Sequence, residues 1–276
     1  MRFAFLAVLV AAAAMPAKAQ ERDWRLCTAG DAGGADQAVA ACTRALAARA
    51  LAPADRVAAL LTRGVYYLNA GQADRALADF TAALRIEPAN VVALNRRGEA
   101  YARKGDFERA FADYGEAVRL NPRYPLAFRN RARIHFYRGS FDAAAEDFRI
   151  AEAADSGNGY SLLWRYVAEA RAGTVDRAGL HRGAALVRDG WPKPLVLHFL
   201  GTVGEADMLA AATADPAARA ERVCEARFFL GQKHILDGAR EAAAAALRQA
   251  LALCPAHMVE ARAARVELER LGAAAR

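Results

Sequence analysis

The sequence predicts an all-α solenoid, and three observations indicate this fold class. Three glycines recur at a constant interval, at Gly71, Gly105 and Gly139. The chain is rich in alanine and has few β-branched clusters, a composition that favours helix. Other positions repeat with the same period, namely Gly64/Gly98/Ala132, Tyr67/Tyr101, Ala76/Ala110/Ala144, Phe80/Tyr114/Phe148 and Pro88/Pro122. A fixed period of about 34 residues indicates one structural unit that is repeated and stacked on its neighbours.

The first 19 residues are predicted to be a secretory signal peptide. Arg2 supplies a positive end, residues 3–15 are apolar, and Ala17-Lys18-Ala19 fits the cleavage site of such a peptide. The apolar run is shorter than the roughly 20 residues that a membrane-spanning helix needs. No cysteine follows the cleavage site, so we expect no lipid anchor and a periplasmic or secreted mature chain that begins near Gln20.

Residues 20–56 are expected to form a helical segment in front of the first complete repeat. Within it, residues 36–50 have the pattern of the second helix of a repeat, whose partner helix is short or missing.

Three complete repeats are predicted over residues 57–158. In the first repeat, helix A covers roughly 57–70 and helix B roughly 73–87. Gly71 lies in the turn between them, where a glycine can adopt the left-handed conformation that ends a helix. Pro88 ends helix B, because proline cannot continue a helix.

The second and third units, 91–124 and 125–158, keep the small, aromatic and turn residues of the first in register. These residues at this spacing resemble the tetratricopeptide repeat (TPR) family. The resemblance implies antiparallel helix pairs that stack into a right-handed superhelix and bind proteins or peptides on the concave side.

The rest of the chain is expected to be a diverged helical block. Residues 159–223 form a diverged repeat and a connector interrupted at Gly190-Trp191-Pro192, and residues 224–276 form a terminal repeat and a capping helix. Trp191 is either a contact site for a partner or, as we favour, a packed hinge. The segments LLWRYVAEARAG, WPKPLVLHFLG and CEARFFLGQKHILDGA are similar to the NlpI-type envelope TPR adaptors. That resemblance implies an adaptor that brings a protease to cell-wall hydrolases.

The four cysteines fall into two local pairs, Cys27/Cys42 and Cys224/Cys254. Export would place them in an oxidising compartment, where disulfides form and persist. Cys224 opens helix A of the terminal repeat and Cys254 closes its helix B, so antiparallel pairing brings the two together. We expect both disulfides; the alternative is free, buried cysteines.

Three arginine–aspartate pairs are predicted to join helix A to helix B. The arginines share one repeat position and the aspartates share another, so the separation along the chain is the same in each pair; the pairs are Arg63/Asp79, Arg97/Asp113 and Arg131/Asp147. In the terminal repeat both charges are replaced together, by Leu230 and Ala246. This joint loss indicates structural ion pairs.

Another face of the A helices is predicted to line a ligand groove. The candidate residues are polar or aromatic and recur at helical spacing: Asn69, Asn95, Arg96, Glu99, Arg103, Arg129, Asn130, Arg133, Phe136 and Tyr137. Arginine and asparagine can hold a carboxylate by charge-assisted hydrogen bonds, so the partner is expected to be an acidic peptide or a free C-terminus. An ordinary solvated surface is the alternative, and Asn69 could instead help to end its helix.

The sequence argues against catalysis and against nucleic acid as a partner. It contains no nucleophile–base motif, P-loop or HExxH, and its five histidines have no metal-ligand spacing, so we expect neither cofactor nor metal. The net charge of +7, which falls to +5 without Arg2 and Lys18, permits nucleic-acid binding, but export argues against it. An exported adaptor is therefore the best interpretation. The alternatives are an exported cell-wall or peptide hydrolase with a helical groove, and a structural homodimer without a client.

Cleavage after Ala19 is the first testable expectation. N-terminal sequencing of the exported protein should read from Gln20. A retained Met1 or a lipid-modified N-terminus would contradict it.

Overall fold

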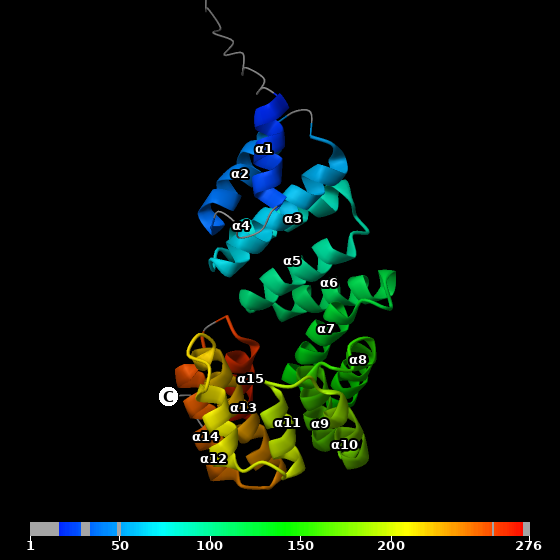
Figure 1. The fold of residues 1–276 in the computed structure, drawn as a ribbon. Coiled ribbons are helices and arrows are strands. Elements are labelled where there is room, and N and C mark those ends of the chain that lie inside the picture. The colour runs from blue at the N-terminus through cyan, green and yellow to red at the C-terminus, as the bar shows by residue number, and fades with distance from the viewer. Residues whose placement is uncertain (1–16, 29–33, 49–50, 256, 273–276) are drawn as a thin grey trace, which may run out of the picture. The chain divides into compact units, whose positions relative to one another are not determined.

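The computed structural model describes residues 17–28, 34–48, 51–255 and 257–272. Within these ranges the chain forms fifteen α-helices and no strand (Figure 1). Most of the predicted signal peptide lies outside the described residues. No helix in the described ranges has both the length and the apolar character of a membrane span.

The chain divides into two compact units, 1–100 and 101–276, and the division falls inside α5. The helices up to α5 are α1 (Ala17–Thr28), α2 (Ala35–Ala47), α3 (Pro53–Asn69), α4 (Ala73–Ile86) and α5 (Val91–Arg103). The following helices are α6 (Phe107–Leu120), α7 (Pro125–Arg138), α8 (Phe141–Ala154), α9 (Gly159–Ala172), α10 (Arg177–Leu186), α11 (Lys193–Leu200), α12 (Glu205–Thr213), α13 (Arg219–Leu236), α14 (Arg240–Leu253) and α15 (Val259–Arg270).

In the first unit, α1 is the partner helix of α2. The sequence predicted that this partner would be short or missing. It has 12 residues and is tied to α2 by the disulfide Cys27–Cys42, with an S–S distance of 2.07 Å. Asp23, on α1, accepts a hydrogen bond from Arg44 Nη2 at 2.7 Å. The disulfide and the ion pair hold α1 against α2.

The turns between paired helices repeat one backbone geometry. Gly71, Gly105, Gly139, Gly173 and Gly238 all have a left-handed φ between 74° and 83°. In the first of these turns, Gln72 N–H donates to Tyr67 O at 2.8 Å, and equivalent bonds recur at the other four. This pattern is the glycine-ended helix stop predicted for Gly71. Because Gly173 follows Gly139 at the same interval as the earlier turn glycines and keeps the geometry, α9 and α10 form a fourth repeat.

Small residues let the two helices of a pair approach closely. A Cβ atom added to Gly64 in α3 would lie 2.5 Å from Phe80 Cε1 in α4. In the terminal pair, a Cβ on Gly231 would lie 2.7 Å from Leu247 Cγ. The fully buried side chain opposite each glycine therefore fills the space that a larger residue would need.

The second unit is built around Trp164, which is fully buried in α9. Its indole packs against Phe136 and Phe148 from the third repeat and against Phe228 and Phe229 from α13, with ring centroids 5.1–5.7 Å apart. This aromatic cluster joins the third repeat to the diverged block. The disulfide Cys224–Cys254 then ties α13 to the end of α14, with a Cα–Cα distance of 4.7 Å.

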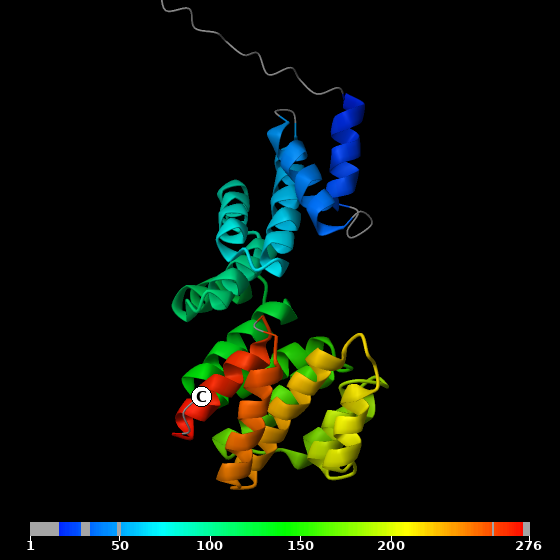
Figure 2. The same cartoon turned by 90° about the vertical axis from the view of Figure 1, so that its left-hand side faces the viewer.

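The last helix, α15, packs next to α14 and also contacts α7. Figure 2 shows α15 in red beside the green repeat helices of this unit. Its residue Arg270 donates from Nη2 to the carbonyl oxygens of Phe136 and Tyr137 on α7, both at 2.8 Å. The C-terminal helix therefore contacts a helix that lies far earlier in the sequence.

The glycine contact can be tested by comparing two Gly→Ala substitutions. Gly64→Ala should lower the free energy of unfolding by about 1–3 kcal/mol, because the new methyl group overlaps Phe80. Gly115→Ala should raise it by about 0.5–1 kcal/mol, because this helical glycine has open space around it. Urea unfolding measures both changes. Equal effects of the two substitutions would contradict the packing described here.

Candidate functional site

The arginines of the repeats fall into a paired set and an unpaired set. In the paired set, Arg63 holds Asp79 with two hydrogen bonds of 2.8 and 2.7 Å, and Arg131 holds Asp147 with two of 2.8 Å. Both aspartates are buried, and each pair joins helix A to helix B as predicted. Arg97 lies in the first unit and Asp113 in the second, so that third pair stays a prediction.

In the first unit, the predicted groove residues differ in exposure. Asn69 is exposed at the last position of α3, whereas Asn95 is only 1% exposed. Arg96 Nη1 lies 3.0 Å from Glu99 Oε2 on the same helix. The two charges on this face of α5 therefore offset each other.

In the second unit, Arg129 and Arg133 lie one helical turn apart on α7, and both are partly buried. Arg129 makes no hydrogen bond or ion pair with any residue that the structure describes. Burial lowers its pKa, and the neighbouring charge of Arg133 lowers it further. Arg133 Nη1 donates to Asn130 Oδ1 at 3.0 Å, but its buried Nε has no hydrogen-bond partner in the described parts of the chain. These guanidinium groups have lost water without gaining a carboxylate partner by hydrogen bond. Arg103, also in this unit, lies at the end of α5.

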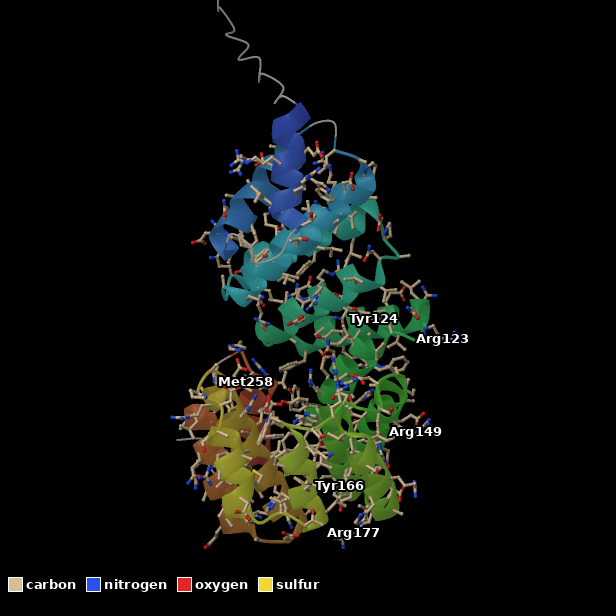
Figure 3. The ribbon with its side chains drawn as sticks, in the orientation of Figure 1. Arg123, Tyr124, Arg149, Tyr166, Arg177 and Met258 are labelled. Atoms are coloured by element: carbon tan, nitrogen blue, oxygen red, sulfur yellow. A yellow bond between two sulfur atoms is a disulfide. The ribbon has the colours of Figure 1, made fainter. Side chains whose placement is uncertain are left out.

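Phe136 and Tyr137 do not lie on an open surface. Phe136 is fully buried and packs edge-on against Phe141 and Trp164, so its predicted place in a groove is corrected to the core. Tyr137 is partly buried, and its hydroxyl donates to Val259 O at 3.3 Å, at the start of α15. Tyr124 and Met258, which precede α7 and α15, are labelled in Figure 3.

Two buried or partly buried glutamates lie close to the N-terminal end of α15, one on α13 and one on α15 itself. Glu225 on α13 accepts hydrogen bonds at one oxygen, Oε2, from Tyr160 Oη at 2.9 Å and from Trp191 Nε1 at 2.6 Å. Glu260 on α15 is 4% exposed, and burial raises its pKa to about 7. Burial also raises the pKa of Glu225. Trp191 thus has a packed, hydrogen-bonded position, which agrees with the hinge interpretation.

These glutamates were not among the predicted site residues, although one signal was present. Glu260 and Glu267 share a helical face with Ala263, Ala264 and Leu268, so two acids stand on the apolar stripe of α15. An acid on an apolar stripe indicates a buried, partnered carboxylate.

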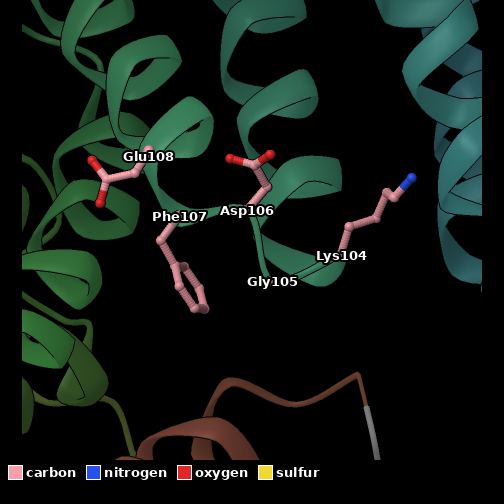
Figure 4. A pocket seen from close by; sticks show the side chains of 5 residues that line it. All are labelled: Lys104, Gly105, Asp106, Phe107 and Glu108. Atoms are coloured by element: carbon pink, nitrogen blue, oxygen red, sulfur yellow. The ribbon is translucent and has the colours of Figure 1, made fainter.

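A pocket lies at the turn between α5 and α6 (Figure 4). It has a volume of about 440 Å³ and is lined by Lys104, Gly105, Asp106, Phe107 and Glu108. In Figure 4, Phe107 points toward the chain segment that leads to α15, and the guanidinium of Arg262 lies 4.7 Å from the centroid of its ring. The pocket is open and mixed in charge, with no convergent set of polar groups of the kind that orients a small substrate. Among the described residues, no three His, Cys, Asp or Glu side chains form a metal-binding group.

Comparison with known protein families identifies the repeats. The tetratricopeptide repeat family matches residues 61–125, 95–159 and 129–191, and successive matches are offset by the interval that separates the turn glycines. These residues are tetratricopeptide repeats. Repeats of this family stack into arrays whose extended surfaces serve as scaffolds for protein–protein interaction.

Two solved structures share the fold. A tetratricopeptide repeat protein from Parabacteroides merdae ATCC 43184 has a TM-score of 0.59 and 17% identity, covering 91% of this chain and 99% of its own. MamA from Desulfovibrio magneticus RS-1, from residue 41 to its end, has a TM-score of 0.52 and 17% identity, covering 63% of this chain and 97% of its own. Identities this low show the TPR fold alone. No curated protein matches the sequence significantly.

The structural role of the paired arginines predicts a stability difference. Arg131→Ala should lower the free energy of unfolding by roughly 1–3 kcal/mol, because it leaves the buried Asp147 without its partner. Arg149→Ala is the matched control, since its partner Glu146 is exposed, and should change stability far less. Thermal unfolding of both variants tests the assignment, which fails if their melting temperatures fall equally.

Proposed function

We propose that this chain is an exported adaptor whose TPR array binds protein or peptide partners, and that Arg129 and Arg133 receive an acidic group of the partner. The observation that carries the proposal is that neither arginine has a hydrogen-bonded carboxylate among the described residues. A carboxylate would supply the hydrogen-bond acceptors that Arg129 and the buried Nε of Arg133 lack. Charge-assisted bonds of this type are about twice as strong as neutral ones.

Export is the second part of the proposal. Its support is the signal-like sequence before Gln20 together with two disulfides, since disulfides persist in oxidising compartments and are rare in reducing ones. Each disulfide holds one end of the helical array: Cys27–Cys42 secures α1, and Cys224–Cys254 secures α14.

The identity of the partners is the finest part of the proposal. The resemblance of the second half to NlpI-type adaptors points to a protease or a cell-wall hydrolase and its clients. A hydrolase and a client-free homodimer are the rival functions. The absence of a nucleophile–base motif in the sequence disfavours the hydrolase.

Peptide binding separates the adaptor from its rivals. Fluorescently labelled acidic peptides with a free C-terminal carboxylate should bind the purified mature chain, and their C-terminal amides should bind more weakly. Arg129→Ala combined with Arg133→Ala should weaken binding at least tenfold, while the melting temperature measured at pH 5, where Glu260 is protonated, changes little, because neither arginine has a hydrogen-bonded carboxylate among the described residues. Fluorescence anisotropy measures the affinity.

The matched control is Arg131→Ala, which removes an arginine from the same helix. It should lower stability and leave the affinity of the folded protein unchanged, because Arg131 is held by Asp147. The proposal is wrong if the double variant binds these peptides as tightly as the parent chain, or if it unfolds while Arg131→Ala does not.

A further inference from the structure

The first turn of α15 carries a buried acid that has few partners. Glu260 is 4% exposed and receives no hydrogen bond from another residue in the described parts of the chain. Its neighbour Glu225 already accepts two hydrogen bonds, from Tyr160 and Trp191. Two carboxylates therefore share one buried region, and only Glu225 has donors from other residues.

The groups that face Glu260 come from three other helices. Arg133 and Tyr137 come from α7, Tyr160 from α9 and Glu225 from α13, while Arg262 lies on α15 itself. Arg262 is placed over the ring of Phe107. Arg133 is therefore the cation from another helix that offsets the charge of Glu260, and Glu225 opposes it with a like charge.

The two halves of α15 are held differently. Its C-terminal half is anchored by Arg270 on the α7 carbonyl groups, by Glu267 paired with Arg171 at 2.7 Å, and by the fully buried Leu268. Its N-terminal half contributes the fully buried but small side chains of Ala263 and Ala264 and the partly buried Val259 to the core, together with the 3.3 Å hydrogen bond from Tyr137 to Val259 O. Opening of the N-terminal half therefore exposes one partly buried valine and two alanines but leaves Leu268 in the core.

We propose that the N-terminal half of α15 is a pH-sensitive latch over α7: with Glu260 protonated it stays seated, and with Glu260 ionised it opens and uncovers Arg133. The part of this inference that concerns binding rests on the proposed function, because Arg133 is one of the two arginines that would receive a partner's acid. The opening itself does not depend on any partner.

The direction of the pH effect follows from the pKa of Glu260. The seated state raises this pKa from 4.5 to about 7, so the seated state binds the proton more tightly than the open state. Seating is unaffected by Glu260 below pH about 4.5, weakens as the pH rises to about 7, and is weakest above that value. The equilibrium constant for opening rises by up to about 300-fold across this window.

Amide hydrogen exchange of the mature, disulfide-bonded chain tests the latch. The probes are the amides of Ala263 and Ala264, followed between pH 4.5 and 8 and corrected for intrinsic exchange rates. Their protection should fall by tens- to hundreds-fold as the pH rises, while that of Leu268 changes much less. Glu260→Gln should abolish the fall, because glutamine does not titrate.

A second variant keeps the test decisive if Glu260→Gln does not fold. Glu225→Gln removes the like charge beside Glu260 and should move the midpoint of the protection change to lower pH. Protection that is independent of pH in the parent chain, or a pH dependence that survives unchanged in either variant, would overturn the latch.

Peptide binding then separates the latch from the proposed function. If α15 opens, the affinity for an acidic peptide should increase between pH 5 and 8. If α15 stays seated, ionised Glu260 repels the peptide, and the affinity should decrease. A decrease with binding still dependent on Arg129 and Arg133 overturns the latch and leaves the adaptor intact. If the peptide binds at no pH while the hydrogen-exchange result is as expected, the proposed function is wrong and the latch stands.

Discussion

The close contact between the two helices of each repeat is the constraint on which the rest of the structure depends. At Gly64 and Gly231, a neighbouring side chain occupies the space where a Cβ atom would lie, so the distance and rotation of the helix pair are set at that position. In the first repeat this contact accompanies the Arg63–Asp79 pair, and in the third repeat, where the buried Ala132 takes the position of Gly64, Arg131 pairs with Asp147 in the same way. Small residues at this position thus accompany the arginines that join helix A to helix B, whereas Arg129 and Arg133 have no hydrogen-bonded carboxylate among the described residues.

The second unit combines this rule with a long-range closure. Trp164 joins the third repeat to α13, and α15 then returns to α7. The same α7 face that carries Arg133 and Tyr137 is therefore covered by the C-terminal helix. In the proposed function, partner binding and C-terminal packing would be coupled through this face, because Glu260 on α15 lies close to the arginine that would receive a partner's carboxylate.

Most of the local structure could be predicted from the sequence, because it is periodic. The turn glycines, the helix pairs and the paired arginines all follow one repeat interval, and both disulfides join the expected cysteines. The contact of α15 with α7 could not be predicted, since residues 137 and 259 are related by no repeat. Phe136 was misplaced because it was grouped with Tyr137, although it stands one helical turn after the buried Ala132 and shares that inner face. The helix α1 could be expected only as a short or missing partner of α2, because it lacks the repeat signature.

Arginine side-chain NMR tests most directly the claim that paired arginines are structural and unpaired ones bind. In the spectrum of the mature chain, the Nε–H resonances of Arg63 and Arg131 should exchange slowly and keep their positions when an acidic peptide with a free carboxylate is added. The resonances of Arg129 and Arg133 should shift with the peptide concentration. Shifts at Arg63 and Arg131 without shifts at Arg129 and Arg133 would contradict the account.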